Sequence, residues 1–151
     1  MKNVFEQIIL AVDASDHSRK AIRIAADIAK RYGSRVTVFH AVEHEYGELF
    51  ESDTVKEAHD LVDEVVRGLK DEGIAARGEI RHTPVGEAAK AILDATEDER
   101  ADLIVIGSRP VSNLHGLLIG SVAQEVVQSS DRPVLVSRES TSAQHHTIEP
   151  D

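Results

Sequence analysis

The segment Ala101–Arg138, ADLIVIGSRPVSNLHGLLIGSVAQEVVQSSDRPVLVSR, carries the pattern that decides the fold. Its run Asp102–Gly107 is short and apolar, which is typical of a strand buried on both faces of a sheet. A loop bounded by glycines follows, and valines at helical spacing predict a helix over Ser121–Gln128. The turn at 131–133 then leads into a last strand, Val134–Val136. Strand, loop, helix and strand in this order indicate an α/β protein.

The chain before this segment shows the same alternation of strands and helices. Gln7–Asp13 is predicted to be a buried strand that ends at a carboxylate, and Arg35–Val42 a second, β-branched strand. Amphipathic helices are predicted over 18–32 and 54–72, and a glycine ends each of them.

A third, less buried strand is predicted over Ala75–Arg81. The pair Thr83-Pro84 has the form of a helix start, with threonine as the N-cap and proline in the first turn. Strands that alternate with helical crossovers form a parallel sheet with helices on both faces. Ligands of such folds bind beyond the carboxyl ends of the strands, where the strand order reverses. We therefore expect the site at the loops Asp13–His17 and Gly107–Gly120.

Length and composition limit the classes of protein that this chain can belong to. Its 151 residues predict one domain over 1–138, followed by a disordered acidic tail over 139–151. The formal net charge of −10 argues against nucleic-acid binding, because such a surface repels phosphate backbones. There is no apolar run long enough to span a membrane, no signal-peptide pattern and no cysteine, so we expect a cytoplasmic protein that does not bind membranes. The acidic surface fits either ordinary solubility or adaptation to high salt.

The common α/β motifs are absent, and a less specific anion site takes their place. The P-loop, the glycine-rich dinucleotide fingerprint and the G-x-S-x-G nucleophile elbow do not occur. Gly120, Ser121 and Val122 would present N–H groups at the start of the last helix, where an anion is stabilised. The alternative interpretation is a simple turn with an N-cap.

Two polar residues near strand ends also have alternative interpretations. Asp13 can cap the following helix or bond the backbone of the loop, or it can bind a ribose hydroxyl or a divalent metal on a phosphate chain. His40 lies on a predicted strand and is interpreted as a packed core residue rather than a ligand.

The sequence resembles a universal stress protein over Phe5–Arg138. The matching blocks are IILAVDASDHSRKAIRIAADIAK, VTVFHAVE and the segment that begins at Ala101. The resemblance implies a five-stranded parallel sheet of order 3-2-1-4-5, in the Rossmann-like fold of the adenine nucleotide alpha hydrolases. It also implies a homodimer formed through the last strand, here Val134, Leu135 and Val136.

The resemblance also implies a nucleotide site. Members of the family that bind ATP carry G-x-x-G, nine residues, and then G-[ST], which falls here on Gly107, Gly120 and Ser121 with Pro110 at the second glycine. Arg109 is included because it can turn toward the phosphates, although a solvated side chain is the alternative. The ligand is expected to be ATP or AMP, with or without Mg²⁺, and Asp13 would hold the metal. The expected nucleotide-binding residues are Val12, Asp13, Ala14, Ala41, Gly107, Arg109, Gly120, Ser121 and Val122.

Pro110 leaves two functions open. The first is a nucleotide-binding regulatory homodimer in the stress response. The second is a dimeric interaction module with an unidentified protein partner and no nucleotide, because proline has no N–H to donate. A lost charge-assisted hydrogen bond costs roughly 1.5–3 kcal/mol, or about 10- to 100-fold in affinity. A slow ATPase is a weaker third alternative, since no general base can be named.

Overall fold

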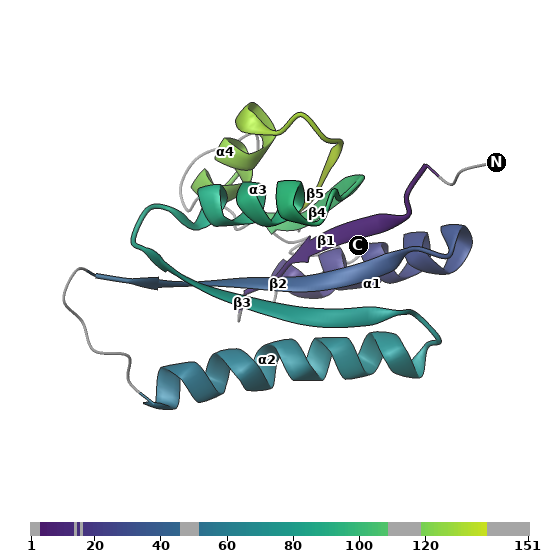
Figure 1. Cartoon of the computed structure of the whole chain (residues 1–151), viewed down its shortest axis with the longest axis horizontal. Coiled ribbons are helices and arrows are strands. Elements are labelled where there is room, and N and C mark those ends of the chain that lie inside the picture. The colour runs from purple at the N-terminus through teal and green to yellow at the C-terminus, as the bar shows by residue number, and fades with distance from the viewer. Residues whose placement is uncertain (1–3, 14, 16, 46–51, 109–118, 139–151) are drawn as a thin grey trace, which may run out of the picture.

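The computed structural model describes residues 4–13, 15, 17–45, 52–108 and 119–138. The expectations for Ala14, Arg109, Pro110 and the tail 139–151 lie outside these residues. Strands and helices alternate along the described chain (Figure 1): β1 (Gln7–Ala11), α1 (His17–Tyr32), β2 (Arg35–His44), α2 (Ser52–Asp71), β3 (Ala76–Pro84), α3 (Ala88–Asp98), β4 (Leu103–Ser108), α4 (Ser121–Ser129) and β5 (Val134–Arg138).

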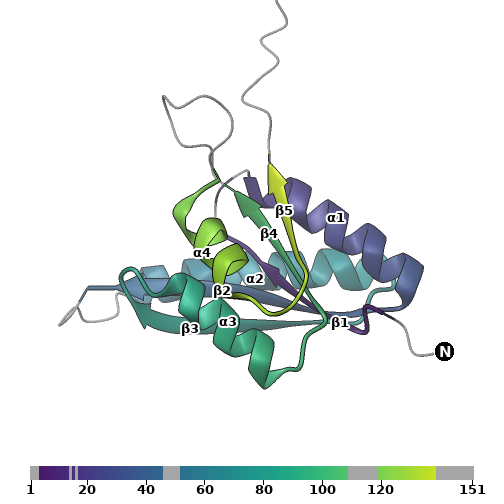
Figure 2. The ribbon, with the colours of Figure 1, turned by 90° about the horizontal axis from the view of Figure 1, so that it is seen from above.

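All strand pairs are parallel, and the five-stranded sheet has the order β3-β2-β1-β4-β5 (Figure 2). The order implied by the family resemblance is therefore confirmed. β1 lies at the centre, where Ile8 pairs with Val36 of β2 on one side and Leu103 of β4 on the other. The chain moves outward from β1 to β3 and then returns to the other side of β1. The strand order thus reverses between β1 and β4, which is where ligands bind in this class of fold.

Helices cover both faces of the sheet, with α1 and α2 on one face and α3 and α4 on the other (Figure 1). Successive residues of β1 serve opposite faces, as the strand period of two requires. Ile8 and Leu10 join the core under α1 and α2, whereas Ile9 joins the core under α3 and α4. All three side chains are fully buried, which explains why the segment reads as a continuous apolar run.

Glycines end α1 and α2 as the sequence predicts. Gly33 has φ of 67° and Gly73 has φ of 82°, a left-handed conformation that other residues adopt only with strain. Each glycine turns the chain directly from a helix toward the next strand of the sheet.

The predicted helix start at Thr83-Pro84 is wrong. Both residues belong to β3, where they pair with Glu43 and His44 of β2, and the N–H of Val85 still donates to the carbonyl of His44 at 3.1 Å. α3 begins only at Ala88. A proline is tolerated there because β3 is an edge strand with no neighbour on its other side in the described sheet.

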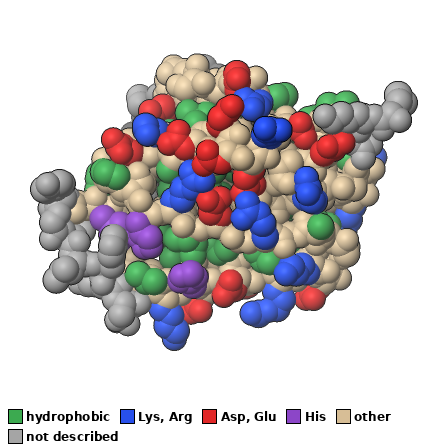
Figure 3. All heavy atoms as spheres, in the orientation of Figure 1, with side chains coloured by type: hydrophobic (Ala, Val, Ile, Leu, Met, Phe, Trp, Pro, Cys, Tyr) green, Lys and Arg blue, Asp and Glu red, His purple; other side chains and the backbone are tan. Residues whose placement is uncertain are grey.

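Charged pairs occupy the surface over β3 (Figure 3). Arg81 bonds Glu79 and Asp98, each at 2.9 Å, and Arg77 bonds Glu99. Charges on an edge strand oppose pairing with the edge of another sheet. None of the described helices has both the length and the apolar composition that a membrane crossing requires.

Candidate functional site

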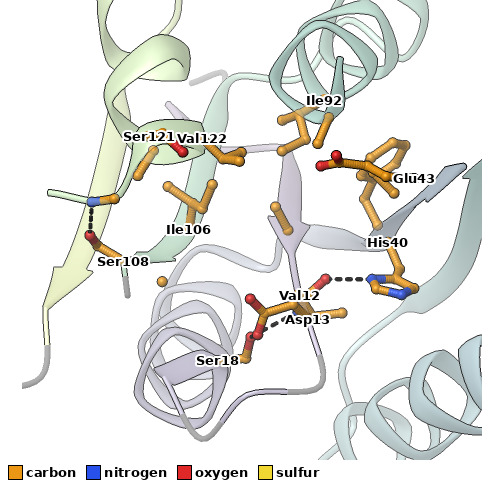
Figure 4. Close-up of a pocket in the computed structure, with 17 residues that line it drawn as sticks. Val12, Asp13, Ser18, His40, Glu43, Ile92, Ile106, Ser108, Ser121 and Val122 are labelled. Atoms are coloured by element: carbon orange, nitrogen blue, oxygen red, sulfur yellow. Dashed lines mark hydrogen bonds between the residues drawn. The ribbon is translucent and has the colours of Figure 1, made fainter. Parts of the chain in front are cut away.

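A cavity of about 560 Å³ opens beyond the carboxyl ends of β1, β2 and β4 (Figure 4). Its walls come from the ends of these strands, from α3 and from the first turn of α4. The cavity therefore lies at the reversal of strand order, as the fold class predicts.

The structure brings together the expected nucleotide-binding residues that it describes. Those that line this one cavity are Val12, Asp13, Ala41, Gly107, Gly120, Ser121 and Val122. The other two expected residues, Ala14 and Arg109, lie outside the described part of the chain. Three segments that are far apart in the sequence thus meet around one space.

Asp13 holds the loop that follows β1. Its Oδ1 accepts hydrogen bonds from the N–H of Ser15 at 2.9 Å, from Oγ of Ser18 at 3.1 Å and from Oγ of Ser15. Its own N–H donates to Ser18 Oγ at 2.9 Å. These bonds fix the direction in which the carboxylate leaves the strand. The loop-bonding interpretation of Asp13 is therefore correct, and it places a preorganised carboxylate at the cavity wall.

His40 joins β2 to the end of β1. Its Nδ1 lies 2.8 Å from the carbonyl oxygen of Val12 (Figure 4), and because a carbonyl can only accept, this nitrogen carries the proton. His40 is half-buried and lines the cavity, so the interpretation of it as a packed core residue missed its position. Its place near the carboxyl end of a predicted strand was the signal that could have found it.

One end of the cavity is largely apolar. Phe39, Ile92 and Ile106 line it and are at most 5% exposed. Glu43 borders the same end, and its Oε2 accepts a hydrogen bond from the N–H of Gly86 at 3.0 Å. Ile106 lies on the strand Asp102–Gly107, which the sequence predicts to be buried, but nothing in the local sequence of Phe39, Ile92 or Ile106 indicates a cavity. A flat apolar group, such as a heterocyclic base, suits this end.

The opposite end presents backbone N–H groups. Gly120 is the N-cap of α4, with φ of −58° and ψ of 155°, and no side chain caps the helix there. Helix geometry leaves the N–H groups of Ser121, Val122 and Ala123 without a partner inside α4. Together with the helix dipole, these donors stabilise an anion at this end of the cavity.

A model of the universal stress protein family matches residues 5–138, which is most of the chain. The chain belongs to the universal stress protein family. Its membership agrees with the observed strand order.

Relatives of this universal stress protein cover nearly its whole length. The "Universal stress protein in QAH/OAS sulfhydrylase 3'region" of Thermus aquaticus is 36% identical over 141 residues, which cover 89% of this chain and all of the relative. The solved structure of the hypothetical protein MJ0577 of Methanocaldococcus jannaschii shares the fold, with a TM-score of 0.79 at 23% identity over 92% of this chain and 99% of that one. The universal stress protein of Archaeoglobus fulgidus, solved in complex with dAMP, matches with a TM-score of 0.69 at 26% identity, covering 88% of this chain and 98% of that one.

The side chains that line the cavity could bind a divalent metal only together with oxygen atoms supplied by a ligand. Among the described residues, no group of three or more His, Asp or Glu side chains is arranged to hold a metal ion. Asp13 and Glu43 are the carboxylates that line the cavity. Mg²⁺ in proteins is commonly bound through one or two carboxylates together with the phosphates of a ligand. This universal stress protein therefore offers part of such a set, and a phosphate chain would have to supply the rest.

Proposed function

We propose that this universal stress protein binds an adenine nucleotide, AMP or ATP, in the cavity and acts through that binding as a regulator in the stress response. The observation that carries the proposal is the polarity of the cavity, which has an apolar end beside β2 and α3 and an N–H-rich end at α4. A nucleotide has the same polarity, with a flat base at one end and an anion at the other. The complex of the Archaeoglobus fulgidus relative with dAMP supports the choice of ligand class.

Each part of the nucleotide has a place in this proposal. The base lies at the apolar end near Phe39 and Ala41, and the ribose lies near Asp13. The phosphates lie at Gly120 and Ser121, where the first N–H groups of α4 bind anionic oxygens. Ala14 and Arg109 belong to the proposed set through the family resemblance alone.

Asp13 would hold Mg²⁺ when the metal arrives with a phosphate chain. A bound Mg²⁺ would neutralise part of the phosphate charge near an acidic protein surface. We therefore expect the affinity for ATP to depend on Mg²⁺ more strongly than the affinity for AMP, because ATP carries more charge.

The test is calorimetric titration of AMP and ATP, with and without Mg²⁺, into the wild type and into Pro110→Gly. Saturable binding to the wild type supports the proposal. If neither protein binds at millimolar nucleotide, the proposal is wrong. If only Pro110→Gly binds, the proline has disabled the site and the second function applies.

That second function is a dimeric interaction module without nucleotide. The missing N–H of Pro110 favours it, because the family's ATP-binding pattern has a glycine at this position. The module would act on an unidentified protein partner, and nucleotide would not change the yield when that partner is captured.

Both functions share a proposed homodimer formed through β5. Val134, Leu135 and Val136 are half-buried, and within the described sheet β5 pairs only with β4. An apolar edge strand of this kind is stabilised by pairing with a second copy. Sedimentation velocity over a range of protein concentrations tests the dimer, and a monomer at every concentration would contradict it.

A further inference from the structure

Ser108, the last residue of β4, forms a hydrogen bond across the base of the loop that precedes α4. Its Oγ accepts the N–H of Gly120 at 2.7 Å, over a separation of 12 residues in the chain (Figure 4). Ser108 is only 4% exposed and lines the cavity, and its bond to Gly120 is partly buried. The hydroxyl therefore ties the end of β4 to the N-cap of α4.

This bond leaves the N–H of Gly120 unavailable to a ligand of the cavity. The sequence predicted that Gly120 would present its N–H to an anion, but that N–H donates to Ser108, so the donors available to a ligand begin at Ser121. The carbonyl of Gly120 accepts the N–H of Gln124 at 2.9 Å, which makes Gly120 the fixed point from which the helix starts. Moving Gly120 would move every donor in the first turn.

We infer that Ser108 is a positioning residue for the phosphate of the bound nucleotide. It acts through Gly120, holding the first turn of α4 so that its N–H groups converge on one anionic group. The inference rests on the proposed nucleotide function and adds a determinant of phosphate binding that the glycine-serine pattern of the loop does not include.

A role limited to stabilising the fold predicts a different result from a positioning role. A general loss of stability would weaken the binding of every ligand of the cavity to the same extent. Loss of the positioned N–H donors would weaken the binding of only those ligands that carry a phosphate. AMP and adenosine differ by that one group, so the ratio of their affinities separates the two roles.

The experiment measures the affinities of AMP and adenosine for the wild type and for Ser108→Ala by calorimetry. We expect Ser108→Ala to lower the affinity for AMP about 3- to 10-fold, which is the range expected for the loss of one neutral hydrogen bond. The affinity for adenosine should be unchanged. Equal affinity of both proteins for AMP would overturn the inference. An equal loss for AMP and adenosine would also overturn it.

Ser130→Ala is the matched control. Ser130 lies just beyond the other end of α4, where its Oγ also forms local bonds with the backbone of Arg132, both at 2.9 Å. This variant also removes a serine hydroxyl that bonds the backbone beside α4, but at the end away from the phosphate. It should leave both affinities unchanged, and a loss of AMP binding equal to that of Ser108→Ala would contradict the inference.

Amide hydrogen exchange in the ligand-free protein separates failure of this inference from failure of the proposed function. Exchange at Gly120 should be slow in the wild type and faster in Ser108→Ala. If the wild type binds neither ligand, the nucleotide function is wrong and the inference falls with it, even where Gly120 is protected. If the wild type binds AMP but exchange at Gly120 is the same in both proteins, only the inference is overturned.

Discussion

Gly78 of β3 lies directly against Val62 of α2, so closely that a Cβ added to Gly78 would collide with Cγ1 of Val62. Val62 is 3% exposed and belongs to the core between α2 and the sheet. The absence of a side chain at Gly78 thus sets how closely the helix approaches the strand.

Gly78→Ala should lower the free energy of unfolding by about 1–3 kcal/mol, because the added methyl group overpacks a filled contact. Urea denaturation measures this change. Combining it with Val62→Ala should recover part of the loss, since the second substitution removes the colliding atom. Two losses that simply add would show that the two residues do not interact.

Gly68→Ala is the matched control within α2. A Cβ at Gly68 meets no atom within 4 Å, and the residue lies inside a helix. Alanine should therefore raise the free energy of unfolding by roughly 0.5–1 kcal/mol, through its higher helix propensity. If Gly68→Ala lowers the free energy of unfolding, then the room available for a Cβ does not explain the difference between Gly68 and Gly78.

Thr37 of β2 is fully buried, and its hydroxyl contacts Gln7 of β1 and Glu99, the C-cap residue of α3. Its Oγ1 donates to Glu99 at 2.6 Å and accepts from the side chain of Gln7 at 3.0 Å. Thr37→Val should cost about 1–3 kcal/mol of unfolding free energy, because both partners lose a bond in a buried site. Thermal or urea denaturation checks this.

Thr96→Val provides the comparison for that substitution. Thr96 is 2% exposed, but its hydroxyl donates only to the carbonyl of Ile92 in the same helix, at 2.7 Å. That carbonyl keeps its helical partner after the substitution, so a smaller loss is expected than for Thr37→Val. An equal or larger loss at Thr96 would contradict the role given to the Thr37 network.

His82 should make stability depend on pH near neutrality. Burial lowers its pKa from 6.5, and the neighbouring His44 and His59 lower it further. Nδ1 of His82 lies 2.7 Å from Nε2 of His44, a bond that requires one nitrogen to be unprotonated. The unfolded chain therefore binds a proton at a higher pH than the folded chain does. Stability should fall as the pH decreases through 6.5 and level off below the folded pKa.

Urea denaturation between about pH 8 and pH 5 measures this dependence. His82→Asn should reduce the slope of stability against pH in that range, because the variant has one fewer group with a shifted pKa. At pH 8 no protonation difference remains between the folded and unfolded states at this site. Identical slopes for the wild type and the variant would contradict the prediction.

Glu72 should contribute stability at neutral pH that is lost in acid. Hydrogen bonds from Arg23 at 2.8 Å and Lys30 at 2.6 Å lower its pKa from 4.5 to about 2. A lowered carboxyl pKa stabilises the fold above pH 4.5, and the contribution disappears as the pH falls toward 2. Glu72→Gln should therefore be less stable than the wild type at pH 7 but not near pH 2. High salt should also reduce the difference in unfolding free energy between Glu72→Gln and the wild type at pH 7.

Asp27→Asn is the control. It loses only a 3.3 Å contact with Arg23, so it should lower the free energy of unfolding less than Glu72→Gln does.

Local pattern predicted the order of strands and helices, because buried parallel strands and amphipathic helices each have a period that the side chains display. It misplaced the start of α3, since Thr83-Pro84 satisfies the local rules for a helix start. The pairing of β3 with β2 over its full length, a long-range interaction, overrides that preference. The order of the strands came from the family resemblance, because local patterns do not specify which strands are neighbours.

In the candidate site, too, local sequence predicted some residues, and others depend on long-range packing. Strand ends and a glycine-serine helix start are visible in the sequence, and they predicted Asp13, Gly107 and Ser121 as neighbours of one cavity. His40 and Glu43 were not predicted as site residues. The end of the predicted strand marks the approximate position of His40, but the contacts of both residues depend on how β2 meets the loop after β1 and the turn before α3. Such contacts form only when separate elements pack together.

The central position of β1 has a consequence for synthesis on the ribosome. Ile8–Ala11 can pair with β2 early, but its other partner, Leu103–Ile106, is made much later. Until then the nascent chain has an unpaired, apolar strand edge, which is a site for aggregation. Because the walls of the cavity include Gly120 and Ala123, any ligand of the cavity can stabilise only a chain whose translation has passed α4.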